Sequence, residues 1–123
     1  MNFEELSKLN KKIMISWEEF NKIDLRAGTI VKSEAFDGLR KPALKLWVDF
    51  GPPLGVKKSS AQVTQHYKPE DLVGMQVIGV TNFPPKQISN FVSEVLITGF
   101  PDENGHVVLS TIDKPVPNGA KLF

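Results

Sequence analysis

The long strand-like run from Leu25 to Phe36 contains Gly28, and this combination constrains the fold more than any other feature of the sequence. A glycine inside a strand weakens the strand and commonly marks a sharp bend, such as the corner of a barrel. We therefore expect the run to form the bent first strand of a small β-barrel.

Later segments also carry the pattern of strands. In the most regular of them, Leu44, Leu46 and Val48 alternate with polar or aromatic residues, which predicts one buried and one exposed face. The Gly- and Pro-rich turn at 51–55 and the Asn-Gly pair at 104–105 predict reversals of the chain. We expect strands at 44–50, 56–60, 75–81, 91–100 and 107–112, and the apolar runs 75–81 and 91–100 should be central strands covered on both faces.

The number and spacing of these strands predict the fold class. Five or six short strands, with a long connection between the third and the fourth, are typical of a small Greek-key barrel. An all-β, five-stranded OB-fold barrel fits the pattern, and an SH3-like barrel fits the spacing almost as well. A loop or short helix is expected in the strand 3–4 connection at 61–73.

The N-terminal region predicts added helices and a domain boundary. Ser16 and Glu19 form a capping box that should begin a short helix at Trp17. Residues 2–12 have the spacing of a short amphipathic helix. We therefore divide the chain into an N-terminal extension or short helix, residues 1–14, and one OB-fold domain, residues 15–123.

Composition excludes several classes of protein. With 123 residues and 41% apolar composition, the chain has the material for one closed core. It contains no cysteine, which excludes disulfides and Cys-ligated zinc and suits a reducing compartment, so we expect a cytoplasmic protein. The N-terminus has no apolar segment of the signal-peptide or membrane-spanning type, so we expect no membrane insertion.

Charge is unevenly distributed along the chain, although the net charge is only +1. Between residues 39 and 68, six lysines and arginines stand against one aspartate. A polyanion-binding protein needs such a sector, but a solvated lysine-rich face explains the same pattern equally well.

No motif of a catalytic or metal site is present in the sequence. His66 and His106 have no partner carboxylate or second ligand at metal-binding spacing. Ser59 and Ser60 lack a glycine-flanked nucleophile elbow, and there is no glycine-rich phosphate loop or acid/base pair. We therefore predict a protein that is not an enzyme and has no metal or cofactor, with both histidines as surface or turn residues.

A set of ordered motifs is similar to the tRNA-binding-domain superfamily. Residues 24–31, Asp-Leu-Arg-Ala-Gly-Thr-Ile-Val, resemble the opening strand of the tRNA-binding domains appended to methionyl-tRNA synthetases, and further matches follow in the same order at 43–46, 82–86 and 93–94. Within the superfamily, the chain resembles the CsaA family of export-related chaperones at 41–43, 49–51, 58–62, 82–88, 93–96 and 115–119. This similarity extends from about residue 15 to the C-terminus.

The resemblance implies an OB-fold homodimer that binds exposed segments of unfolded or export-bound polypeptides, with a capacity to bind tRNA. Two departures favour polypeptides: Val95-Leu96 stand where tRNA-binding relatives carry Gly-Met, and the H-P-x-A-D-K-L signature is reduced to Ala43, Lys45 and Leu46. The leading hypothesis is therefore a CsaA-like chaperone without catalytic activity. The alternative is a dedicated tRNA-binding module that recognises the shape of tRNA or assists a synthetase.

Side-chain chemistry and family positions give the candidate site residues. Lysine and arginine supply the salt-sensitive part of nucleic-acid affinity, and two polar residues match family positions that could contact a base or sugar. The tRNA-binding candidates are Arg26, Lys32, Lys41, Lys45, Lys57, Lys58, Asn82, Lys86 and Ser93. Side chains that could line an apolar peptide groove are Phe36, Trp47, Phe83, Ile88 and Phe91. Candidate dimer contacts are Trp17, Phe20, Val107, Leu109, Val116, Leu122 and Phe123.

Several candidates also have an ordinary structural explanation. Trp47 shares the outward face of its strand with Lys45, and cover by a neighbouring element or a dimer partner is favoured over base stacking or a peptide groove taken singly. Asn82 could serve turn geometry, and core packing is favoured for Phe91. Arg26 could equally pair with an acidic residue, either Asp24 or Glu94.

Overall fold

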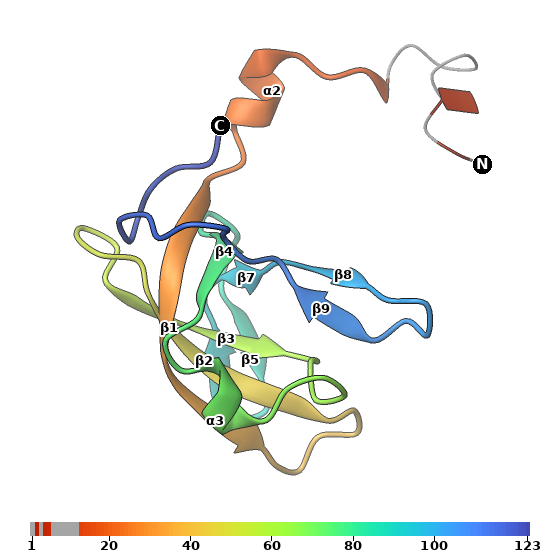
Figure 1. Ribbon diagram of the computed structural model, residues 1–123, viewed down its shortest axis with the longest axis vertical. Helices are drawn as coiled ribbons and strands as arrows, with labels where there is room; N and C mark the ends of the chain where they lie inside the picture. The colour runs from red at the N-terminus through yellow and green to blue at the C-terminus, as the bar shows by residue number, and fades with distance from the viewer. Residues whose placement is uncertain (1, 3, 6–12) are drawn as a thin grey trace.

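Strand β1 (Leu25–Phe36) organises the fold, because it is long enough to pair with a different neighbour along each half of its length. In the computed structural model, which describes residues 2, 4–5 and 13–123, β1 pairs antiparallel with β4 through its first half and with β2 through its second half. The central sheet has the order β3-β2-β1-β4-β7 and is strongly curled (Figure 1). The other four strands are β2 (Ala43–Asp49), β3 (Val56–Ala61), β4 (Gln76–Val80) and β7 (Leu96–Ile97).

Gly28 lies where β1 crosses closest to the core, as expected of a glycine inside a strand. A Cβ atom on Gly28 would lie 2.6 Å from Val48 Cγ1 and 2.8 Å from Phe50 Cδ1, so only glycine allows β1 to cross the core this closely. The pairing of β1 with β2 then shifts register between Ile30 and Lys32, as in a β-bulge. Together these features turn one long strand through the corner of the barrel.

Hydrogen bonds join β3, at one edge of the sheet, to the segment just before β7, at the opposite edge. The amides of Glu94 and Val95 donate to the carbonyl oxygen of Lys58, at 2.8 and 3.3 Å. In return, the amide of Lys58 donates to Oε1 of Glu94 at 3.1 Å. The segment that leads into β7 is thereby joined to β3, which gives the OB-like barrel that the sequence predicts.

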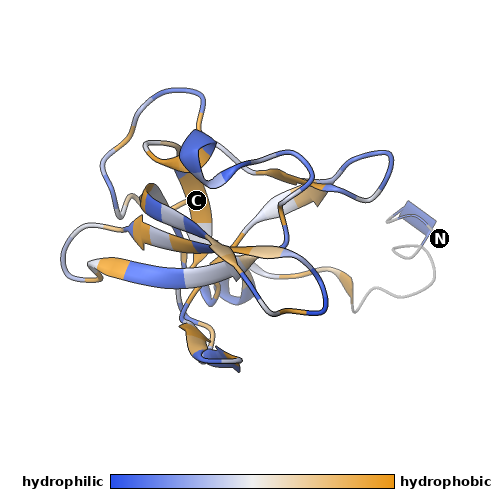
Figure 2. Cartoon of the chain, turned by 90° about the horizontal axis from the view of Figure 1, so that it is seen from below, coloured by the Kyte–Doolittle hydropathy of each residue, from blue (hydrophilic) through white to orange (hydrophobic). Residues whose placement is uncertain are grey.

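The core lies inside the curled sheet and is almost entirely apolar. Alternate residues of the strands point into it, and Figure 2 shows hydrophobic and hydrophilic segments alternating along the strands. The largest fully buried side chains are Phe50, Ile30, Leu46, Leu72, Val48, Val63 and Val77. Burial of each such side chain contributes about 1.5–3 kcal/mol to stability, so this core carries the fold.

Residues near the C-terminus complete the outer edge of β1. The amide of Gly119 donates to Ala27, the amide of Ala27 donates to Ala120, and the amide of Leu122 donates to Leu25, at distances of 2.8–2.9 Å. The hydroxyl of Thr29 also donates to Asn118 Oδ1 at 2.7 Å. The first strand of the sheet is thus held between β4 and a segment that comes much later in the chain.

Within residues 13–123, two short helices and two hairpins are added to the sheet. Helix α2 (Trp17–Asn21) begins with the predicted capping box, in which the Glu19 amide donates to Ser16 Oγ at 3.1 Å and the Ser16 amide donates to Glu19 Oε1 at 3.2 Å. It stands apart from the sheet, at the same end of the molecule as the C-terminus (Figure 1). Helix α3 spans Pro69–Leu72. One hairpin consists of β5 (Lys86–Ile88) and β6 (Phe91–Ser93), and the other of β8 (Gly99–Pro101) and β9 (Val107–Leu109). No helix among the described residues is long and apolar enough to cross a membrane.

The secondary structure differs from the sequence prediction in the apolar run 91–100. The apolar run 91–100 does not form one central strand; it is divided among β6, β7 and β8, which belong to three different sheets. The chain changes partner at Glu94 and again at Thr98, so Leu96 and Phe100 are left exposed. The helix predicted for residues 2–12 falls mostly on residues outside those that the structure describes.

Candidate binding site

A pocket of about 580 Å³ opens beside the edge of β3. It lies between β3, the β5–β6 hairpin and the segment that runs into β7. Its apolar wall includes two half-exposed side chains, Phe83 at 54% and Leu96 at 50%, together with Pro84, Ile88 and Val95. This much exposed apolar surface around a concave site favours a ligand with apolar parts.

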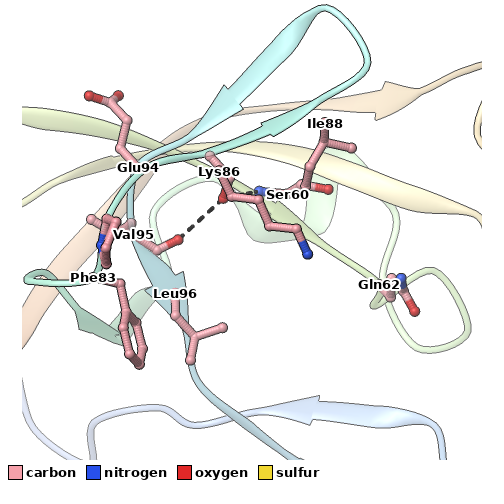
Figure 3. A pocket seen from close by; sticks show the side chains of 10 residues that line it. Ser60, Gln62, Phe83, Lys86, Ile88, Glu94, Val95 and Leu96 are labelled. Atoms are coloured by element: carbon pink, nitrogen blue, oxygen red, sulfur yellow. Dashed lines mark hydrogen bonds between the residues drawn. The ribbon is translucent and has the colours of Figure 1, made fainter.

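Polar groups stand at fixed places around the same pocket. Lys86 extends across it from β5, with Phe83 and Leu96 along one side and Gln62 at the far end of β3 (Figure 3). The Ser93 hydroxyl accepts a hydrogen bond from the Ser60 amide at 3.3 Å, which ties the β5–β6 hairpin to β3. The pocket therefore combines an apolar wall with one cationic residue, one anionic residue, Glu94, and several neutral polar ones.

Lysines and aromatic rings form a second surface, which we call the lysine–aromatic face, on the outside of β1, β2 and β3. The ammonium of Lys45 lies 4.8 Å from the ring centre of Phe36 and 5.4 Å from that of Phe91, and Lys58 lies 5.3 Å from Phe91. Lys32 lies 4.6 Å from Trp47. At these distances the ammonium groups themselves lie over the rings, as in cation–π contacts.

The structure brings together four of the predicted site residues in the pocket. Phe83 and Ile88 come from the peptide-binding set, and Lys86 and Ser93 come from the tRNA-binding set. Lys32, Lys45 and Lys58 lie instead on the lysine–aromatic face. Of the other predicted cations, Lys41 is exposed, and Lys57 lies 4.0 Å from Glu94.

Three aromatic candidates have a structural role. Phe36 and Phe91 are buried and pack edge to face at 5.4 Å, so neither can form the wall of a peptide groove. Trp47 is half-buried and packs against Phe91 at 5.8 Å, so a neighbouring hairpin covers it, as the structural explanation supposed. The β5–β6 hairpin lies over this part of the sheet, and that position could not be predicted from strand patterns.

Two polar candidates are also used within the chain. Arg26 pairs with Asp24 at 2.8 Å and donates to the carbonyl oxygen of Gly119 at 3.0 Å. The side chain of Asn82 accepts from the Asp24 amide at 3.0 Å and donates to the Lys22 carbonyl at 2.7 Å. Both side chains therefore hold the start of β1 in place, and neither is free to bind a ligand through these groups.

The same network sets the ionisation of Asp24. Burial tends to raise the pKa of this carboxyl, but hydrogen bonds from Thr81 and Arg26, with the charges of Arg26 and Lys121, hold the pKa below its ordinary value. The carboxylate of Asp24 therefore remains charged where it joins β1 to the end of β4.

The predicted dimer contacts divide into exposed and buried residues. Trp17, at 83%, and Phe123 are among the most exposed large apolar side chains of the described residues, and Val116 and Leu122 are partly exposed. Leu109 is buried in the core, so its assignment to a dimer surface was wrong, and Val107 packs against the same core. Phe20 is partly buried.

Some pocket residues were missed by the sequence analysis, namely Ser60, Gln62, Pro84, Glu94, Val95 and Leu96. All of them lie within or next to the segments that carried the family resemblance. That resemblance was the signal that could have found them. The sequence shows no partner carboxylate for the histidines at metal-binding spacing, but the fold places His66 Nε2 2.6 Å from Oδ2 of the distant Asp102.

Comparison with known proteins identifies the family. Residues 25–121 match the family model described as "Putative tRNA binding domain". The chain belongs to the tRNA-binding-domain family. Within this family, it is 48% identical to the crystal structure of the chaperone CsaA from Bacillus anthracis, with a TM-score of 0.83 over 89% of this chain and 99% of that one. The CsaA chaperone protein from Picrophilus torridus is 46% identical, with a TM-score of 0.82 over 89% of this chain and all of that one.

Members of the tRNA-binding-domain family also occur as parts of larger proteins. The methionine–tRNA ligase of Methanocaldococcus jannaschii is 38% identical over 112 residues, which are 91% of this chain. The chain spans only 16% of the length of that ligase. The resemblance to CsaA and to synthetase-appended domains that the sequence predicted is therefore confirmed.

Proposed function

We propose that the protein is a CsaA-like chaperone that binds unfolded or export-bound polypeptides in the cytoplasm and performs no chemical reaction. The observation that carries the proposal is the pocket beside β3, whose apolar wall includes the half-exposed Phe83 and Leu96. Unfolded chains share exposed apolar side chains rather than a sequence, so a pocket with apolar walls and few polar anchors suits them.

The polar side chains of the pocket fit the backbone of such a guest. Lys86 and Gln62 can donate hydrogen bonds to the carbonyl oxygens of the guest. Hydrogen bonds to the main chain are independent of the guest's sequence, so they add affinity without selecting one client.

A homodimer is part of this proposal. Trp17 of α2 and the terminal Phe123 are large apolar side chains that nothing in the described chain covers. A second copy of the chain, brought together through α2 and the C-terminal segment, would remove both from water.

Binding of tRNA is a second function that one observation favours. Lys32, Lys45 and Lys58 present three positive charges on the lysine–aromatic face, on the strands that OB folds commonly use for nucleic acids. This face is distinct from the pocket, so a polypeptide and tRNA need not compete for the same residues.

The polypeptide proposal is tested with a fluorescently labelled, permanently unfolded polypeptide and the purified protein. In Leu96→Asp, the guest can no longer bury the exposed half of the leucine side chain, which costs about 1 kcal/mol of binding free energy. The substitution also places a carboxylate against apolar groups of the guest. We expect at least about tenfold weaker binding, measured by fluorescence anisotropy.

Phe100→Asp is the matched control for this experiment. Phe100 lies on β8, is 67% exposed and is not part of the pocket, so it receives the same charge on an equally open apolar site. Its affinity for the polypeptide should remain that of the unaltered protein. Equal loss in both variants, or no loss in Leu96→Asp, would overturn the pocket as the binding site.

The tRNA proposal is tested by the dependence of tRNA affinity on salt. Lys45→Ala with Lys58→Ala should reduce the slope of log affinity against log salt by about 0.7–0.9 for each phosphate contact that is lost. A control pair, Lys22→Ala with Lys114→Ala, removes two exposed lysines away from this face. The idea fails if both pairs change the slope equally.

A further inference from the structure

A cluster of two histidines and one aspartate lies outside both surfaces described so far. His66 follows β3 in the turn at 64–66, whereas Asp102 and His106 belong to the turn between β8 and β9. Their ligand atoms all lie within 4.8 Å of one another. The fold thus brings His66 next to Asp102, which lies 36 positions later in the sequence.

We propose that His66, Asp102 and His106 form a binding site for a divalent transition-metal ion, with Zn²⁺ as the ion that fits best. Two imidazoles and one carboxylate are a common protein ligand set for zinc, and they leave a fourth position for water or another donor. Hard cations such as Mg²⁺ prefer an all-oxygen environment, which this site does not provide.

The turn between β8 and β9 holds the aspartate in a fixed orientation. Oδ1 of Asp102 accepts hydrogen bonds from the amides of Asn104 and His106, both at 2.9 Å. Oδ2 is left pointing at His66, whose Nε2 lies 2.6 Å away. One oxygen of this carboxylate is thus held by the backbone, and the other faces the imidazole that would share the metal ion, which is the arrangement of a monodentate metal ligand.

The segment that carries His66 is held against the same hairpin by a separate contact. The amide of Leu109, in β9, donates to the hydroxyl of Tyr67 at 3.0 Å, and the rings of His66 and Tyr67 lie 6.3 Å apart. The rings of His66 and His106 lie 6.0 Å apart. The two ligand-bearing segments are therefore already joined before an ion binds, which lowers the entropic cost of forming the site.

Small side-chain rotations convert this arrangement into a coordination site. With bonds of about 2.0–2.1 Å, the ligand atoms around a tetrahedral zinc ion lie about 3.3 Å apart. The His66–Asp102 separation of 2.6 Å must therefore widen by less than about 1 Å, while His106 moves inwards. His66 and Asp102 keep 40% and 24% of their side-chain surface open, so an ion can enter from solution.

Isothermal titration of zinc chloride into the full chain, prepared without a polyhistidine tag, tests the proposal. We expect one zinc ion per chain with micromolar affinity, and no binding of Mg²⁺. His66→Ala and His106→Ala should each weaken binding by more than the roughly 10–100-fold that losing a second-shell partner costs. Asp113→Asn, which removes an exposed carboxylate outside the cluster, should bind zinc as the unaltered protein does.

A second measurement needs no substitution, so it remains decisive if a variant fails to fold. The chain contains only two histidines, so ¹⁵N spectra of their side chains report on both ligands in the unaltered protein. Zinc should shift one ring nitrogen of each histidine in parallel, saturating at one equivalent. Absence of heat, or shifts at one histidine alone, would leave His66 and Asp102 as a hydrogen-bonded pair and overturn the metal site.

Discussion

Replacing Gly28 by alanine tests whether the close approach of β1 to the core determines the barrel. The added Cβ would lie 2.6 Å from Val48 Cγ1 and within 2.9 Å of two atoms of the Phe50 ring. Val48 and Phe50 are fully buried, so neither can turn into solvent to make room. Either the strands separate or both side chains leave their rotamers.

The size of the effect follows from two opposed contributions. Overpacking of a core costs about 1–3 kcal/mol, whereas alanine in place of a strand glycine gains about 0.5–1 kcal/mol. The net expectation for Gly28→Ala is a loss of about 1–2 kcal/mol of unfolding free energy. At about 4 °C per kcal/mol for a domain of this size, the Tm should fall by about 4–8 °C in a thermal melt.

The sign of the change makes this a strict test. If Gly28 were merely a flexible position, alanine would raise the Tm, and that result would refute the reasoning. A double-mutant cycle adds a second check, because Val48→Ala removes the closest atom that the new Cβ would meet. In that background, the cost of Gly28→Ala should shrink by at least about 0.5 kcal/mol, and an unchanged cost would contradict the steric explanation.

Three further predictions concern the start of β1 and the dimer. Asn82→Ala should lower the unfolding free energy by about 1–2 kcal/mol in urea melts, because the amide of Asp24 and the carbonyl of Lys22 lose their partner, and an unchanged midpoint would contradict this role. The pKa of Asp24 is below its ordinary value of 3.8, so its contribution to stability is complete above that pH and is lost as the pH falls through the lowered pKa. Asp24→Asn should therefore make the protein less stable at about pH 6 but remove this part of the decline towards about pH 3, and an unchanged slope of stability against pH would argue against it. Trp17→Ser should shift the protein towards monomer in sedimentation velocity, whereas an unaltered sedimentation coefficient would exclude α2 from the interface.

Local patterns were sufficient for most of the barrel. The glycine within β1, the alternation of β2 and the Asn-Gly turn before β9 each determine structure through neighbouring residues, and all three were found where the sequence placed them. The run 91–100 was misjudged for the opposite reason. Its apolar composition fits one buried strand, but its three parts pair with three different partners, and pairing between distant segments leaves no local pattern.

The candidate site was predicted less completely than the fold, again because of distant pairing. Lys86 and Ser93 were expected among the binding residues, but the hairpin that carries them also packs its Phe91 against Trp47, and the sequence offered both aromatic residues as peptide-binding candidates while favouring a structural role for each. The proximity of His66 to Asp102 depends on two loops meeting in space, so spacing within the sequence could not show it.

The pairing of β1 with residues 118–122 has a consequence for synthesis on the ribosome. The amide and carbonyl of Ala27 leave the exit tunnel early, yet the atoms that satisfy them are translated some ninety residues later, as the 93-position span between Arg26 and Gly119 shows. During that interval, the edge of a hydrophobic strand stays unprotected and can pair with a neighbouring nascent chain. A protein whose proposed task is to shelter unfinished chains therefore passes through the same vulnerable stage during its own production.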